Sequence, residues 1–268
     1  ADKPVLQDCA VWNSTRIGLH LLYCYQAKVL GGLYRGANLV VSEQLGYGIL
    51  LESNWASEVR GAIFKECRRA VDVSGYDDDG VPCWYCVIAG NQAYGGGYAE
   101  DGSDLWPIGA EGGSGFGSHG PAVGTVYENN LCVNTFRGFT IRGRDETIRN
   151  NTLIGAISTP IWCQHGGGLL VEDNRYTDQY EEGLETPGTS TGAISLTRRP
   201  DSLIYLIPTE YDTDKHLTVK GNTARNVKLG LVYVDGAVDA PIKNWVMHDN
   251  TVVILSGTPG IVGLLNRD

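Results

Sequence analysis

The chain has 268 residues, of which 42% are hydrophobic and 36 are glycine, and it carries a formal net charge of −10 with an isoelectric point near 4.9. A surface this acidic argues against nucleic acid and against an anionic membrane surface as partners. The sequence shows neither a signal peptide nor an apolar run that could span a bilayer, so we expect no membrane insertion.

Short apolar segments separated by turn residues fill the chain from Cys9 to Val73. No stretch shows sustained helical periodicity, which predicts an all-β protein. Three segments are predicted as the second strand of successive coils, and three as their partners: Gly18–Leu21, Gly48–Leu51 and Ala70–Val73, with Cys9–Asn13, Lys28–Leu30 and Val59–Ile63.

The stretch at about 74–121 is predicted to be a long Gly-rich loop insertion that combines carboxylates with aromatic rings. Long irregular loops on a rigid scaffold usually carry function. Aromatic faces stack on the C–H faces of sugars, and carboxylates accept hydrogen bonds from sugar hydroxyls. The stretch is therefore the predicted ligand surface, although a solvated loop that merely covers the scaffold is the alternative. The candidate ligand-binding residues are Tyr76, Trp84, Tyr98, Asp101 and Trp106.

Candidate acid–base groups lie in and beside the same stretch. Asp77 and Asp79 point to one side of an extended segment and could act as a carboxylate pair in a glycosidase, with Glu100 as a further carboxylate. His119 could transfer protons, and Arg142 could meet an acidic sugar. The alternatives are a polar turn for the aspartates and a plain loop residue for His119.

The second half of the chain repeats an apolar strand that ends at asparagine, followed by another short strand. Self-similarity at a short period marks a solenoid, whose coils bury a continuous core only when stacked. Because rungs lie about 4.8 Å apart, equivalent asparagines can form a ladder. The asparagines are Asn130, Asn151, Asn174, Asn222 and Asn250, and the strands that follow them are Gly138–Ile141, Pro160–Cys163, Gly192–Ser195, Gly230–Tyr233 and Gly260–Gly263.

This repeat predicts one parallel β-helix domain of nine or ten coils over residues 1–268. The wide gap between Asn174 and Asn222 predicts smaller inserts at about 178–191 and 198–215. An antiparallel sandwich with Asn-rich turns is the alternative fold.

The chain contains seven cysteines, an odd number, and most lie beside apolar strands. We therefore predict reduced, buried thiols and folding in a reducing cytoplasm. The pair Cys83 and Cys86 lacks a second pair of ligands, so no metal site is predicted. No cofactor motif is present.

The repeat resembles the right-handed parallel β-helix superfamily, which includes pectin-acting enzymes and phage tailspikes. Asp77–Asp79, Ser118–Gly120 and Phe139–Arg142 also fall in the order of the polygalacturonase pattern, with Ser118 in place of Gly, Thr140 in place of Arg and Arg142 at the Lys position.

The resemblance implies a carbohydrate-recognising β-helix of a viral tailspike or surface protein that binds a polysaccharide or cell-surface glycan. It implies a homotrimer at the virion surface or outside the cell, folded in a host cytoplasm. Two alternatives stay open: a polysaccharide depolymerase of the glycoside hydrolase or lyase class, and a non-enzymatic structural protein whose β-helix is a rigid oligomeric element.

Overall fold

The computed structural model describes residues 3–14, 16–37, 46–75, 81–95, 114–156, 160–164, 168–177, 202–207, 217–227, 230–235, 245–254 and 264–267. Every regular element in these ranges is a β-strand. None of the described residues forms a helix long and apolar enough to cross a membrane.

The strands form three nine-stranded sheets and one two-stranded sheet, and all strand pairs are parallel. Sheet A contains β1 (Val5–Gln7), β4 (Lys28–Leu30), β7 (Glu58–Arg60), β11 (Val87–Ala89), β15 (Val126–Glu128), β18 (Thr147–Arg149), β21 (Leu169–Glu172), β24 (Leu217–Lys220) and β27 (Trp245–His248). Sheet B contains β2 (Ala10–Trp12), β5 (Leu33–Arg35), β8 (Ile63–Lys65), β12 (Gln92–Tyr94), β16 (Leu131–Val133), β19 (Thr152–Ile154), β22 (Arg175–Thr177), β25 (Thr223–Val227) and β28 (Thr251–Ile254).

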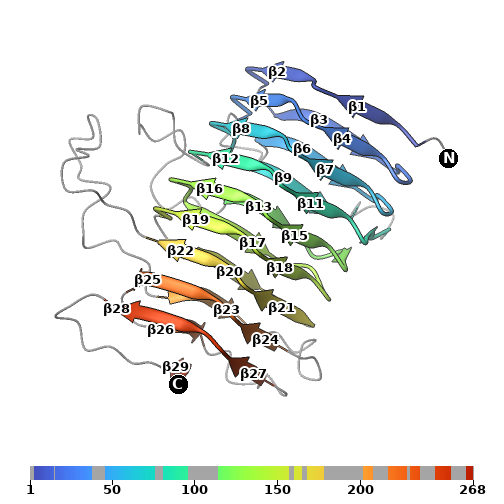
Figure 1. Cartoon of the computed structure of the whole chain (residues 1–268). Coiled ribbons are helices and arrows are strands. Elements are labelled where there is room, and N and C mark those ends of the chain that lie inside the picture. The colour runs from blue at the N-terminus through green and yellow to red at the C-terminus, as the bar shows by residue number, and fades with distance from the viewer. Residues whose placement is uncertain are drawn as a thin grey trace, which may run out of the picture.

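Sheet C contains β3 (Ile17–Leu22), β6 (Tyr47–Glu52), β9 (Arg69–Ser74), β13 (Ser114–Ser118), β17 (Arg137–Ile141), β20 (Ile161–Gln164), β23 (Ser202–Ile207), β26 (Gly230–Asp235) and β29 (Leu264–Arg267). The fourth sheet consists of β10 (Cys83–Trp84) and β14 (Ala122–Val123). Each turn of the chain adds one strand to sheets A, B and C in sequence, and the coils stack from the N-terminus to the C-terminus (Figure 1).

The predicted parallel β-helix is confirmed, but each coil has three main strands where the repeat suggested two. Most sheet B strands contain three residues with only the central one buried, as in Leu131–Val133, where Cys132 is buried. A strand with a single inward residue is too short to show the alternation of buried and exposed residues by which a strand is recognised in a sequence.

Aromatic side chains from successive coils meet among the aliphatic side chains in the core of the β-helix. The rings of Tyr34 and Phe64 stack with centroids 5.2 Å apart. Phe139 lies 5.7 Å from both Phe116 and Tyr127, again between ring centroids. Equivalent inward positions therefore meet across rungs, as a solenoid requires.

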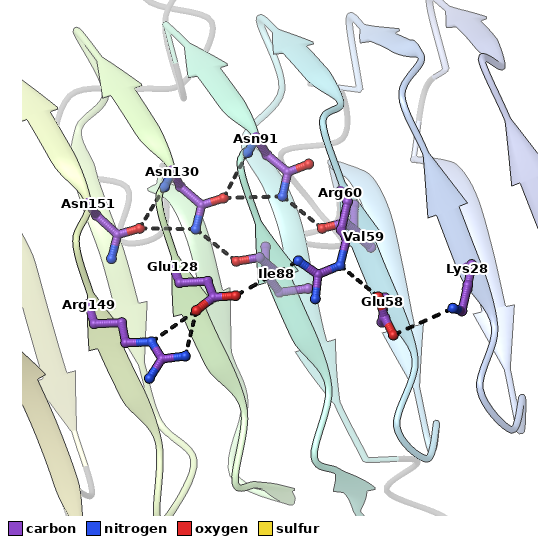
Figure 2. Close-up of polar contacts among 10 residues, drawn as sticks. All are labelled: Lys28, Glu58, Val59, Arg60, Ile88, Asn91, Glu128, Asn130, Arg149 and Asn151. Carbon is purple, nitrogen blue, oxygen red and sulfur yellow. Dashed lines mark hydrogen bonds and ion pairs between the residues drawn. The ribbon is translucent and has the colours of Figure 1, made fainter.

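The asparagines form the predicted ladder at the corner between sheets A and B (Figure 2). Each donates from its amide nitrogen to the amide oxygen of the next, at 2.9–3.1 Å. Asn91 begins the ladder and was missed by the sequence analysis. The left-handed backbone belongs to the residue before each ladder asparagine, not to the asparagine itself: Gly90, Asn129, Asn150, Asp173, Gly221 and Asp249.

Two predicted inserts need correction. The stretch at 74–121 is not one loop, because its described parts contain strands β10 to β13. Gly115 and Gly117 looked like loop residues, but they lie in β13, where a side chain at Gly115 would meet the Cys132 sulfur. The predicted insert at about 198–215 is not a plain insert, because it contains β23, which follows β20 in sheet C. The predicted strands Gly192–Ser195 and Gly260–Gly263 and the predicted insert at about 178–191 lie outside the described residues.

All seven cysteines are free, which confirms the predicted thiols, and five of them are buried. The sulfur atoms of Cys83 and Cys86 lie 3.8 Å apart without a bond. Burial raises the pKa of the Cys67 thiol to about 12, so that thiol is unreactive at neutral pH. The described residues contain no group of three or more His, Cys, Asp or Glu side chains that could hold a metal ion.

Candidate functional site

Sheet C differs from the other two sheets because four of its strands, β6, β9, β13 and β17, are buried on both faces. In sheets A and B the flanking residues of a strand are partly exposed, as in β15 and β16. In β13 and β17 every residue is buried, and in β6 and β9 only the last one is partly exposed. The outer face of sheet C thus holds polar side chains in a desolvated layer.

A buried ion pair lies at the centre of this layer. The guanidinium of Arg69 pairs with the carboxylate of Asp72, and both side chains are 1% exposed. Arg69 Nε also donates to the hydroxyl of Ser114 at 3.0 Å. A Cβ at Gly117 would lie 3.3 Å from the guanidinium carbon of Arg69. Gly117 therefore leaves the space on the neighbouring coil that the Arg69 guanidinium occupies.

The free side of the Asp72 carboxylate holds an imidazole. His119 Nδ1 lies 2.6 Å from Asp72 Oδ2, whereas Arg69 is bound to Oδ1. Because an ionised carboxylate only accepts hydrogen bonds, Nδ1 is the donor in this contact, and in a neutral imidazole the lone pair is then on Nε2. The His119 side chain is 27% exposed, and among the described residues its Nε2 has no hydrogen-bond partner. The arrangement resembles the buried carboxylate that orients a catalytic histidine.

The electrostatics of the layer keep Asp72 charged. Burial alone would raise the pKa of its carboxyl, but Arg69 and His119 outweigh burial and hold that pKa well below its usual range. The Tyr47 ring lies edge-on to His119 with centroids 6.4 Å apart. Burial and then the charge of Asp72 raise the pKa of the Tyr47 phenol, so the phenol stays protonated at neutral pH.

Arg142 occupies the neighbouring coil beside His119. Gly117 of β13 pairs with Thr140 of β17, so residues 119 and 142 follow their strands at equivalent positions. The Arg142 guanidinium lies 5.4 Å from the centre of the Trp162 ring, which is also 4.5 Å from the Arg137 guanidinium. The layer therefore places one cation, Arg142, with the indole that it contacts, on the coil next to that of His119.

Ser118 fixes the backbone of both candidate residues from the inner side. Its hydroxyl accepts hydrogen bonds from the amides of Arg142 and Gly143, each at 3.0 Å, and donates to Glu146 Oε2 at 2.8 Å. Glu146 is fully buried, and burial raises the pKa of its carboxyl to about 8. The turn after β17 is thus tied to the residue that precedes His119.

The structure brings together two of the predicted catalytic residues, His119 and Arg142. Trp84 lies in β10, which is bonded to the segment that follows His119. The amide of its neighbour Cys83 donates a hydrogen bond to the carbonyl of Pro121, two residues after His119. The other predicted site residues lie outside the described residues: Asp77, Asp79, Glu100, Tyr76, Tyr98, Asp101 and Trp106. Asp72, Arg69 and Tyr47 were not among the predicted site residues. An ionisable residue inside the apolar strand Ala70–Val73 was the available signal.

Comparison with known proteins identifies the fold. No protein-family model matches the chain, and no curated protein matches by sequence. Among solved structures, the tailspike gp54 of Acinetobacter baumannii bacteriophage AP22, in complex with A. baumannii capsular saccharide, is 17% identical with a TM-score of 0.56 and covers 88% of this chain. A tailspike mutant of E. coli bacteriophage HK620 is 11% identical with a TM-score of 0.58 and covers 90% of this chain. The chain spans only 35% and 41% of these two tailspikes.

An alginate lyase from Paenibacillus sp. str. FPU-7 is 11% identical with a TM-score of 0.56, and the match covers 97% of this chain and 90% of the lyase. These likenesses confirm the expected resemblance to tailspikes and polysaccharide-acting β-helices at the level of the fold.

Proposed function

We propose that this chain binds and depolymerises a cell-surface polysaccharide, with His119 as the group that moves a proton. The observation that carries the proposal is the imidazole that reaches solvent while its other nitrogen is held by the buried, charged Asp72. A histidine used only for packing does not need an ionised partner that is itself locked by a buried arginine. Positioned acid–base groups contribute about 10²–10⁴-fold to a rate.

The neighbours of His119 suit an acidic substrate. Arg142 supplies a cation beside the imidazole, and Tyr47 supplies a phenol that stays protonated. Hydrolysis of a glycosidic bond ordinarily uses two carboxyl groups, and Asp77, Asp79 and Glu100 remain predictions for that role. Elimination instead needs a base, an acid and a cation, which His119, Tyr47 and Arg142 could provide. The products of the reaction distinguish a glycoside hydrolase from a lyase.

The tailspike likeness supports a place for the chain on a virion surface or outside the cell, as a carbohydrate-recognising part of a tailspike or adhesin. The solved relative AP22 gp54 is in complex with a capsular saccharide. A homotrimer that folds in the host cytoplasm belongs to the same proposal, and the seven free thiols support folding under reducing conditions.

The test is incubation with a panel of alginate, polygalacturonate and bacterial capsular polysaccharides, read by released reducing ends and by the ultraviolet absorbance of unsaturated sugars. Unsaturated products indicate a lyase, and saturated reducing ends indicate a hydrolase. His119→Gln should lower kcat by about 10²–10⁴-fold while leaving binding intact. The matched control is His20→Gln, since His20 also meets a carboxylate on sheet C, Glu52 at 2.7 Å, but lies at the surface. Full activity of His119→Gln would remove the proposal.

One observation supports the alternative function, a structural oligomeric element: the outer face of sheet B carries apolar side chains. Leu33, Ile63, Leu131 and Val133 flank the buried central residues of their strands there, and Ile63 is well exposed. This alternative expects no cleavage and no glycan binding across the panel. It also expects Ile63→Glu to lower the mass measured by light scattering.

A further inference from the structure

A strip of exposed aromatic rings runs along the corner between sheets C and A. Tyr25 pairs with Trp55, and Trp55 pairs with Trp84, in successive parallel bridges, so the three residues occupy one position in three consecutive coils. Tyr85 follows Trp84, and its ring is 5.9 Å from that of Trp84 and 6.2 Å from that of Trp55. The Trp55 and Trp84 rings are 6.0 Å apart. We call Tyr25, Trp55, Trp84 and Tyr85 the aromatic strip.

Three rings of the strip are open to solvent, and Trp84 is partly buried. Trp55 is 48% exposed, Tyr85 is 54% exposed and Tyr25 is 38% exposed. Large aromatic side chains that gather on the surface of a soluble protein usually mark a binding site. A glycine of the next coil makes room for one of these rings, because a Cβ at Gly124 would lie 2.6 Å from Tyr85 Cδ1. Gly124 in the next coil therefore lets the Tyr85 ring lie against the corner.

The fold does not need these rings to hold its corner. The residues on the inner side of the same turns are buried, including Asn54, Cys83 and Ala122. Asn54 fixes the backbone by donating from its amide nitrogen to the carbonyls of Leu21 and Glu52, at 2.5 and 2.8 Å. In later coils the outer position of this ladder holds Val123 and then Arg144, with the same parallel pairing. At this position the described ladder therefore holds aromatic residues in its first three coils and other residues in the next two.

The chemistry of the strip fits sugar rings. Aromatic faces stack on apolar C–H faces, while the indole N–H and the phenol hydroxyl offer hydrogen bonds at the edge. Equivalent positions repeat at about 4.8 Å along the axis, which is comparable to the length of one sugar residue in an extended chain. Cations flank the strip: the Lys3 ammonium lies 5.7 Å from the Tyr25 ring, and Arg144 follows in the same ladder.

We propose that the aromatic strip is a second polysaccharide-binding site, in which successive sugar residues of one chain stack along the axis of the β-helix. The ligand class rests on the proposed function, but the site is separate from His119. The two are joined by the turn after β13, whose Ala122 amide donates to the His119 carbonyl and which leads into the strand paired with Trp84. In this proposal the strip binds one segment of a long polysaccharide while the next segment of the same polysaccharide reaches the His119 imidazole.

The test measures binding of the same polysaccharide panel by affinity electrophoresis and by quenching of tryptophan fluorescence, with Trp55→Ala, Trp84→Ala and the double variant. Each single change should weaken the Kd about 2- to 10-fold, as expected for the loss of one aromatic stacking contact, and Trp55→Phe should restore most of it. The matched control is Trp12→Ala, because Trp12 is 58% exposed but lies in β2 on sheet B. Its affinity should equal that of the unchanged chain.

Two outcomes overturn the inference: Trp55→Ala and Trp84→Ala bind like Trp12→Ala, or they change the oligomeric mass and leave glycan affinity unchanged, which would assign the strip to a protein contact. Absence of binding to every polysaccharide of the panel overturns both proposals. If a polysaccharide of the panel binds, the cleavage assay with His119→Gln distinguishes the two proposals. Binding that depends on the strip but is not followed by cleavage supports the strip as a binding site and contradicts the proposed reaction. Cleavage that is unchanged in the strip variants supports the proposed reaction and contradicts the strip as a binding site.

Discussion

The outer faces of sheets A and C both carry ion pairs, and the central pair of sheet C, Arg69 and Asp72, differs in burial from the pairs of sheet A. On sheet A, Glu58 binds Arg60 at 2.6 Å and lies 3.9 Å from Lys28, and Glu128 binds Arg149 at 2.6 Å (Figure 2). All of these side chains are partly exposed. On sheet C, Arg69 and Asp72 are almost completely buried. Oppositely charged side chains therefore form a solvent-exposed ladder on sheet A and a desolvated pair at the centre of sheet C.

The difference indicates what each face is for. Exposed ion pairs contribute about 0–1 kcal/mol each, and they keep the edges of the rungs charged and soluble. A buried pair rarely makes a fold more stable than apolar residues of the same size would, because both ions lose their hydration. The charges of sheet C instead converge on His119, through the contact of its Nδ1 with Asp72. We therefore interpret the sheet A ladder as structural and the sheet C pair as functional.

Arg69→Met is the substitution that should disturb this arrangement most. It leaves the Asp72 carboxylate buried without its main partner, and removal of one member of a buried pair costs about 3–5 kcal/mol of unfolding free energy. Urea unfolding at pH 7 measures the effect. The loss should shrink as the pH falls, because Asp72, whose pKa is no longer held low by Arg69, then takes up a proton.

The double variant Arg69→Met/Asp72→Leu sharpens the test by removing both charges. It should recover most of the stability of the unchanged chain, since no buried charge is left alone. It should not recover polysaccharide cleavage, because His119 has lost the carboxylate that orients it. Recovery of full activity in the double variant would show that the pair is structural, like the sheet A ladder.

Glu146 provides a pH-dependent comparison at the inner side of the same turn. Burial raises the pKa of its carboxyl from its ordinary value of 4.5 to about 8, so the folded chain binds a proton that the unfolded chain has released. Stability from this group is complete below about pH 4.5 and is lost as the pH rises toward 8, by at most about 1.4 kcal/mol per unit. Glu146→Gln should flatten this slope.

The measurement is the unfolding free energy of both proteins between pH 5 and about 9, compared as a difference so that other titrating groups cancel. Glu146→Gln should become the more stable of the two as the pH approaches the upper end. Identical slopes would mean that Glu146 is ionised in the fold at neutral pH. The Ser118 hydroxyl, which donates to Glu146 Oε2, retains an acceptor in the glutamine variant.

The sequence predicted the solenoid because stacking forces equivalent residues to recur, and Asn130, Asn151 and Asn174 recur at short intervals. Asn91 escaped because a long segment separates it from Asn130, which hides the repeat. His119 and Arg142 could be proposed from residue type alone. Their link to Asp72 could not, because His119 and Asp72 are 47 residues apart and meet only when coils stack. Trp84 was predicted from a loop composition, whereas the rings beside it share a corner position that only the register reveals.

Arg149→Met, the counterpart of Arg69→Met on sheet A, should have the smallest effect. Arg149 donates from Nε and from a terminal guanidinium nitrogen to Glu128 Oε2, at 2.9 and 2.6 Å, but its side chain is 43% exposed. Water can solvate Glu128 after the substitution, and Arg60 remains 3.8 Å from that carboxylate. The expected loss is about 0.2–1 kcal/mol in low salt, and it should fade toward zero near 1 M salt because exposed pairs are screened. Urea unfolding at two salt concentrations tests this, with polysaccharide cleavage expected to be unchanged. A loss as large as that of Arg69→Met, or one that salt does not reduce, would abolish the distinction between the two faces.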